Sequence, residues 1–244
     1  MKHLSPWLLL VLLAWVSPAH AQDGGAPVGW LKLSMDSPLR NRWSLYSEVE
    51  TREGNAQLTG QQLGRLGLRL RVAPCVSLTA GYVLAANEGL VRYGPATPEH
   101  RLYQEIASAD VAGPIRVGHR MRTEERWLRP TPEGAYRYAP RLRYQLRLLV
   151  PLHRGGALPV RSFYAVAADE VFAGLGARPG RSFLEENRAS LGLGYRLSRR
   201  TAIELAYLYQ SQARGPIEGQ AATRNAVQVS LSVTAPSHQA LVRK

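Results

Sequence analysis

The sequence predicts an all-β fold: an antiparallel transmembrane β-barrel of about ten strands, with twelve as the alternative count, behind an N-terminal signal peptide. The first observation is the fifteen-residue segment 136–150, which alternates between two faces with a period of two. One face is tyrosine, proline, leucine and valine, and the other carries Arg137, Arg141, Arg143 and Arg147. Strands of soluble proteins average five or six residues, so an apolar face of this length favours a membrane barrel.

The second observation is that the same alternation recurs along the chain between turn-forming stretches. The ten predicted strands are residues 42–52, 62–73, 75–87, 99–109, 115–128, 136–150, 161–173, 183–197, 201–212 and 225–234. Short and long connections alternate, as in barrels with tight periplasmic turns and longer external loops. This phasing predicts that both ends of the barrel lie at the periplasmic mouth. Residues 29–36 could add a further strand.

The third observation is the N-terminus, which has the zones of a secretory signal. Lys2 and His3 precede an apolar run from Trp7 to Val16, and Ala19-His-Ala21 suits signal peptidase. No later segment has eighteen consecutive apolar residues, so membrane residence would have to be through strands. The predicted organisation is a signal peptide at 1–21, an N-terminal segment at 22–41, the barrel at 42–234 and a tail at 235–244. The expected location is the outer membrane of a Gram-negative bacterium.

The cost of placing charge in lipid decides which face of each strand points inward. An arginine at the bilayer midplane costs about 2 to 4 kcal/mol, so exposing the four arginines of 136–150 would cost roughly 8 to 16 kcal/mol. The arginines are therefore predicted to line the lumen. The same parity gives a lumen network of Arg101, Arg116, Arg120, Arg122, Glu124, Arg126, Arg137, Arg141, Arg143, Arg147, Glu186, Arg188 and Glu204, with Glu48, Glu50, Glu99 and Glu105 among the further carboxylates.

This network allows two interpretations. One is a packed set of salt bridges that satisfies buried charge and fills a small barrel, and the other is an arginine-lined conduit or site for a small anion. Aromatic residues near strand ends are interpreted as interfacial girdles, including Trp43, Tyr82, Trp127, Tyr136, Tyr164 and Tyr209. The expected partners are outer-membrane lipid and lipopolysaccharide, the outer-membrane assembly machinery and a small anion.

Several other classes of function are disfavoured. The formal charge of +13 could suggest nucleic acid, but the arginines alternate within strands instead of clustering. The single cysteine, Cys75, excludes an intramolecular disulfide and a thiolate metal cluster, and no cofactor or metal is expected. An outer-membrane hydrolase of lipid or peptide with its site at the external rim remains an alternative, and its candidates are Glu99, His100 and Glu186. Parity places His100 on the lipid side, and no motif supplies a serine nucleophile. A soluble periplasmic barrel is a third hypothesis.

Six short motifs, in this order, resemble the bacterial family catalogued as domain of unknown function 2490. They are Glu99-His-Arg-Leu-Tyr-Gln104, His119-Arg-Met-Arg-Thr-Glu-Glu-Arg126, Arg141-Leu-Arg-Tyr144, Asp169-Glu-Val-Phe172, Glu186-Asn-Arg188 with Gly192-Leu-Gly-Tyr195, and Tyr207-Leu-Tyr-Gln210. The resemblance covers nearly all of the predicted mature chain. It implies an outer-membrane-type barrel, and it brings no established activity and no catalytic residue.

Overall fold

The structure is a computed structural model of the 244-residue chain. It describes residues 27–55, 59–88, 96–129, 131–153, 158–176, 183–213 and 222–236. The predicted signal peptide at 1–21 and residues 237–244 of the predicted tail lie outside this part. Within the described residues, no helix has the length and apolar character needed to cross a membrane.

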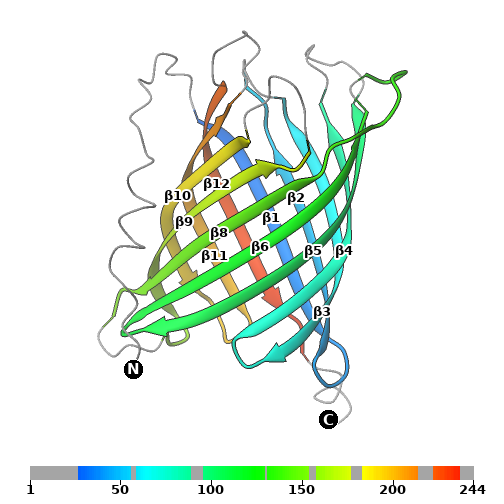
Figure 1. The fold of residues 1–244 in the computed structure, drawn as a ribbon. Helices are drawn as coiled ribbons and strands as arrows, with labels where there is room; N and C mark the ends of the chain where they lie inside the picture. Colours follow the sequence, from blue (N-terminus) through cyan, green and yellow to red (C-terminus); the bar gives the residue numbers. More distant parts are fainter. Residues whose placement is uncertain are drawn as a thin grey trace.

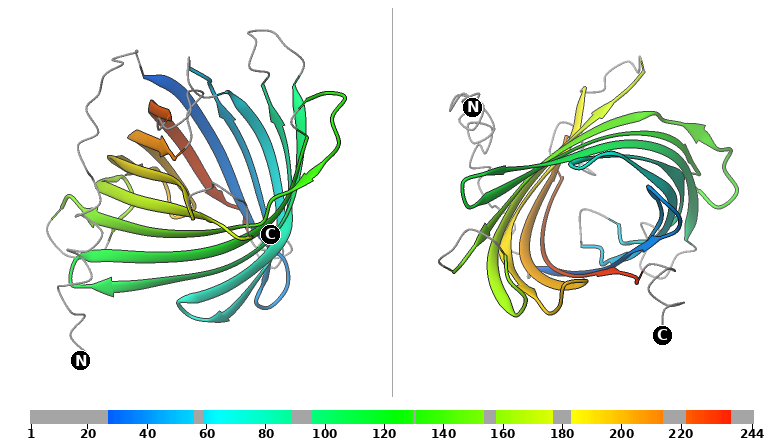
Figure 2. Two further views of the ribbon diagram at one scale, coloured as in Figure 1. Left: turned by 45° about the horizontal axis from the view of Figure 1, so that its top comes forward. Right: turned by 90° about the horizontal axis from the view of Figure 1, so that it is seen from below.

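Twelve strands form one sheet, which curls into a barrel (Figure 1). The strands are β1 (Val28–Pro38), β2 (Trp43–Arg52), β3 (Gln61–Ala73), β4 (Val76–Asn87), β5 (Thr97–Ala112), β6 (Ile115–Leu128), β7 (Arg137–Tyr138), β8 (Arg141–Pro151), β9 (Ser162–Gly174), β10 (Leu184–Arg196), β11 (Thr201–Gln212) and β12 (Ala222–Thr234). The view along the barrel in Figure 2 shows the closed wall. The all-β barrel predicted from the alternation is confirmed.

Eleven of these strands make the closed wall, because β5 pairs with β6 and β1 pairs with β12. The pair β1–β12 is parallel, whereas every other neighbouring pair is antiparallel. The added strand is β1, in the region where the sequence allowed one. Because the number is odd, the barrel begins at one mouth and ends at the other. The expectation that both ends lie at the same mouth is therefore wrong.

The predicted strand 136–150 is interrupted. Its residues form β7 and β8 with a break at Ala139 and Pro140, since proline has no N–H to donate to a ladder. β8 pairs with both β6 and β9, whereas β7 pairs with β6 alone. Arg137, in β7, therefore lies beyond the closed wall.

The two mouths differ in the connections they carry. We call the end with the β1–β2, β3–β4, β5–β6, β8–β9 and β10–β11 connections the turn mouth, and the opposite end the loop mouth. The chain between β5 and β6 is only two residues long, and so is the chain between β3 and β4. The loop mouth, at the top of Figure 1, carries the connections after β2, β4, β6, β9 and β11.

The outer face is apolar and exposed along most of the wall. Leu31 on β1, Leu66 on β3, Leu191 on β10 and Leu205 on β11 are between 56% and 67% exposed. Charged side chains are buried on the inner face instead. One predicted girdle residue is misplaced: Tyr164 is 2% exposed and faces the lumen, where its hydroxyl donates to Glu204.

Candidate functional site in the barrel lumen

The lumen is filled unevenly along its axis, as the order of inward residues on a single strand shows. On β10, Glu186 and Arg188 lie toward the loop mouth, and Ser190 and Gly192 follow toward the turn mouth. The other strands repeat this order: Glu99 and Arg101 precede Ala107 on β5, and Arg224 precedes Ser230 and Ser232 on β12. Most bulky charged side chains therefore occupy the loop-mouth half, whereas small side chains of β10 and β12 line part of the turn-mouth half, which also holds Tyr164 and the Arg69–Asp36 ion pair.

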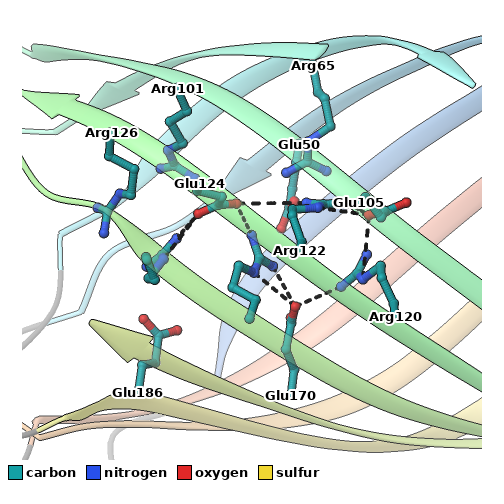
Figure 3. A network of polar contacts seen from close by, with 12 residues as sticks. Glu50, Arg65, Arg101, Glu105, Arg120, Arg122, Glu124, Arg126, Glu170 and Glu186 are labelled. Atoms are coloured by element: carbon teal, nitrogen blue, oxygen red, sulfur yellow. Dashed lines mark hydrogen bonds and ion pairs between the residues drawn. The ribbon is translucent and has the colours of Figure 1, made fainter. Parts of the chain in front are cut away.

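Six side chains in the filled half form a closed ring of alternating charge, which we call the charge ring (Figure 3). Its members, in order, are Glu105, Arg122, Glu124, Arg143, Glu170 and Arg120. Arg143 bridges two carboxylates, at 2.6 Å from Glu124 and 2.8 Å from Glu170. Arg120 lies 2.8 Å from Glu170 and 3.9 Å from Glu105. The ring adds side-chain links across the four neighbouring strands β5, β6, β8 and β9.

Glu124 is the centre of this arrangement, and its side chain is 0% exposed. One carboxylate oxygen accepts from Arg143 at 2.6 Å, and the other accepts from Arg141 at 2.6 and 3.1 Å. Arg141 donates to this one oxygen through both Nε and Nη2, a fixed pair of donors that a lysine does not have. A buried carboxylate needs such partners, because desolvation would otherwise make its charge costly.

Further ion clusters surround the charge ring. Glu99 accepts from Arg126 at 2.6 Å and from Arg101 at 2.8 Å. Glu186 accepts from Arg188, and from Gln210 at 2.9 Å and Gln212 at 3.2 Å. On the opposite wall, the ion pair Arg65–Glu48 joins β3 to β2, and the ion pair Arg52–Glu50 lies within β2.

Aromatic rings join these clusters into one body. The guanidinium carbons of Arg141, Arg143 and Arg188 lie 4.6 to 4.9 Å from the centre of the Phe172 ring. Arg188 also lies 5.2 Å from the Trp30 ring centre, and Arg52 lies 4.7 Å from it. The guanidinium carbons of Arg65 and Arg122 lie 5.6 and 4.9 Å from the centre of the Tyr103 ring. Cation–π contacts therefore run from β8 to β1, and the charge ring links them to those around Tyr103 on β5. We call the whole body the plug.

A cavity of about 310 Å³ adjoins the plug within the lumen. Its wall toward the turn mouth includes Ser34, Ser190, Ala206 and Ser232. The cations that line it are Lys32, Arg52, Arg65, Arg120, Arg143, Arg147 and Arg188, and the carboxylates are Glu48, Glu50, Glu170 and Glu204. Seven cations face four carboxylates, so the lining has a positive excess.

Most predicted lumen residues lie in the plug or the cavity, but two do not. Arg116 is exposed near the β5–β6 turn, and Arg137 is exposed on β7. Neither forms an ion pair within 4.0 Å in the described part of the chain. Arg147 and Glu204 are placed in the cavity, where they pair at 2.5 Å.

The three catalytic candidates are not brought together. Glu99 and Glu186 face the lumen, where each is held by arginine. His100 lies on the outer face between two tyrosine hydroxyls, those of Tyr82 and Tyr136, and the latter is 3.0 Å from Nε2. The wall of the barrel separates this imidazole from both carboxylates. The geometry therefore offers no acid–base pair at the rim from these residues.

Sequence reasoning missed several members of the plug. Glu170 and Phe172 were visible in the Asp169-Glu170-Val-Phe172 motif, but both faces of β9 are rich in apolar residues, so alternation did not show which one points inward. Trp30, Arg52 and Arg224 were missed because they lie at strand ends. The backbone register of β8 and β9 places Phe172 opposite Arg143, and so puts Phe172 on the same inward face of the wall as this arginine.

The fold defines the class of protein as a closed β-barrel with a charged lumen. The NanC porin, solved in a rhombohedral crystal form, has a similar fold, with a TM-score of 0.51 at 9% sequence identity, over 85% of this chain and 98% of that one. The chain belongs to the family described as protein of unknown function (DUF2490), whose model matches residues 28–220. The comparison with curated proteins found no match.

Proposed function

We propose that the protein resides in the outer membrane and acts there as a narrow, anion-selective pore of low conductance. The membrane location is supported by the outer face, where long leucine side chains on several strands are exposed. Soluble monomers rarely expose contiguous apolar patches larger than a few hundred Å². The apolar run and cleavage-type residues in 1–21 support export.

The single observation that supports a pore function is the positive charge of the lumen. The plug narrows the loop-mouth half, and the remaining cavity has more cations than carboxylates. A narrow, low-dielectric passage with a positive lining lowers the energy of an anion and raises that of a cation. Because buried side chains take up much of the section, the current should be far smaller than that of an open porin.

The test is a two-part measurement on the full chain. Membranes are fractionated and the protein is followed by its heat-modifiable mobility, which should place folded protein in the outer membrane. Purified protein is then inserted into planar bilayers under a potassium chloride gradient. Small current steps with a reversal potential set by chloride are expected. Silence from folded protein would favour a purely structural barrel, and potassium selectivity would contradict the proposal.

A further inference from the structure

The cavity beside the plug contains donor groups that the salt-bridge network does not use. Lys32, on β1, is the one lysine in the described part of the chain, and it forms no ion pair within 4.0 Å there. Its charge acts at longer range on Glu48, Glu50 and Glu204. Each of these carboxylates already has its own arginine, so the ammonium is left without a direct counter-charge.

Other cavity residues add to this donor surplus. Arg147 donates a hydrogen bond from Nη2 to Glu204, and 38% of its side chain is exposed. Arg65 and Trp30 are 4% and 2% exposed, and the Nε of Arg65 and the Nε1 of Trp30 have no hydrogen-bond partner within the described residues. The amide side chain of Gln145 lies on the same lining. Buried donors without acceptors are costly, so the residues around the cavity carry a surplus of donors and favour an anion as the ligand.

The cavity size limits the ligand. A volume of about 310 Å³ equals roughly ten water molecules at about 30 Å³ each. The small side chains of Ser34, Ser190, Ala206 and Ser232 leave room on the turn-mouth side of the cavity, whereas the plug occupies the loop-mouth side. A ligand would therefore approach from the turn mouth and stop against the plug.

We propose that this cavity is a binding site for a small oxyanion, a carboxylate or a phosphate with a polar body, held by Lys32 and Arg147. The proposal rests on the same lumen as the pore and adds to it the class of solute that the lumen recognises. Lysine supplies a mobile point charge, in contrast to the fixed guanidinium forks of the plug. Serine hydroxyls and the amide of Gln145 would contact the polar body of the solute.

The test uses the purified, folded full chain in detergent at fixed chloride. Gluconate, glycerol 3-phosphate and inorganic phosphate are titrated calorimetrically, with neutral sorbitol for comparison. Saturable binding of at least one anion, and none of sorbitol, is expected. In parallel, an amine-acylating reagent is applied with and without the bound anion, and peptide mass spectrometry should show slower modification of Lys32 when the anion is present.

The variants locate the site. Lys32→Gln and Arg147→Gln should each weaken anion binding at least tenfold, whereas Arg137→Gln, outside the closed wall, should stay within twofold of wild type. Absence of saturable anion binding to the wild type, equal binding of sorbitol, or equal affinities in all variants would overturn the site. Current recordings on the same preparation separate the two proposals. Anion binding without current would contradict the pore and support the binding site. Anion current without saturable binding would support the pore and contradict the binding site.

Discussion

Replacing Glu124 by glutamine should destabilise the barrel strongly, because this carboxylate is the shared partner of two buried guanidinium groups. The substitution keeps the shape of the side chain and removes its charge. Arg143 would keep Glu170 at 2.8 Å, but Arg141 would lose the only carboxylate that lies within 4.0 Å of it in the described structure. Removing one partner of a buried ion pair costs about 3 to 5 kcal/mol. The remaining contacts of Arg143 place the expected loss near the lower end, at about 3 kcal/mol.

The assay is equilibrium unfolding in urea, with tryptophan fluorescence as the signal and electrophoretic heat-modifiability as the test of folding. Glu125→Gln is the matched control, since the neighbouring glutamate points outward, opposite Leu102, and forms no ion pair among the described residues. Its effect should stay within about 0.5 kcal/mol, as for an ordinary surface substitution. A loss below about 1 kcal/mol for Glu124→Gln would refute the reasoning that the plug depends on buried charge pairing.

Three further predictions test the packing, the outer face and the orientation. In Gly67→Ala, the added Cβ would overlap the hydroxyl of Tyr103, so the free energy of unfolding should fall by about 1 to 3 kcal/mol. Gly64→Ala on the same strand is the control, because a Cβ there meets open space and should be tolerated. Leu191→Arg, at a mid-strand position 67% exposed, should cost about 2 to 4 kcal/mol in a bilayer, and a neutral effect would favour a soluble barrel. Cys75 is exposed in the β3–β4 turn, so an impermeant maleimide should label it only after the outer membrane is permeabilised; labelling on intact cells would contradict turn-mouth placement in the periplasm.

The strands were predictable wherever charge fell on one face only. Arg141, Arg143 and Arg147 on β8 cannot face lipid cheaply, so the parity of that strand followed from its sequence. On β9, Tyr164, Val166 and Phe172 lie on one face and alanines and valine on the other, so local sequence did not show which face is inner. That ambiguity accounts both for the misplacement of Tyr164 and for the omission of Glu170.

Closure and side-chain pairing were beyond the reach of local patterns. The parallel contact of β1 with β12 joins residues almost two hundred positions apart, such as Val28 and Ala226, and no turn connects them. The candidate lumen residues could be named from parity, but the link from Glu124 through Arg143 to Glu170 depends on the stagger of three strands. A period of two reports the face of a residue and not its height in the barrel.

The most direct test of the narrowed lumen is the single-channel conductance of a variant in which one ion pair of the plug is removed without changing the net charge. Arg143→Ala combined with Glu170→Ala deletes two neighbouring members of the charge ring, and heat-modifiability verifies that the barrel still folds. We predict a conductance several-fold above that of the wild type, with selectivity for anions retained. An unchanged conductance in the folded double variant would contradict the central claim that the Arg–Glu plug narrows the pore.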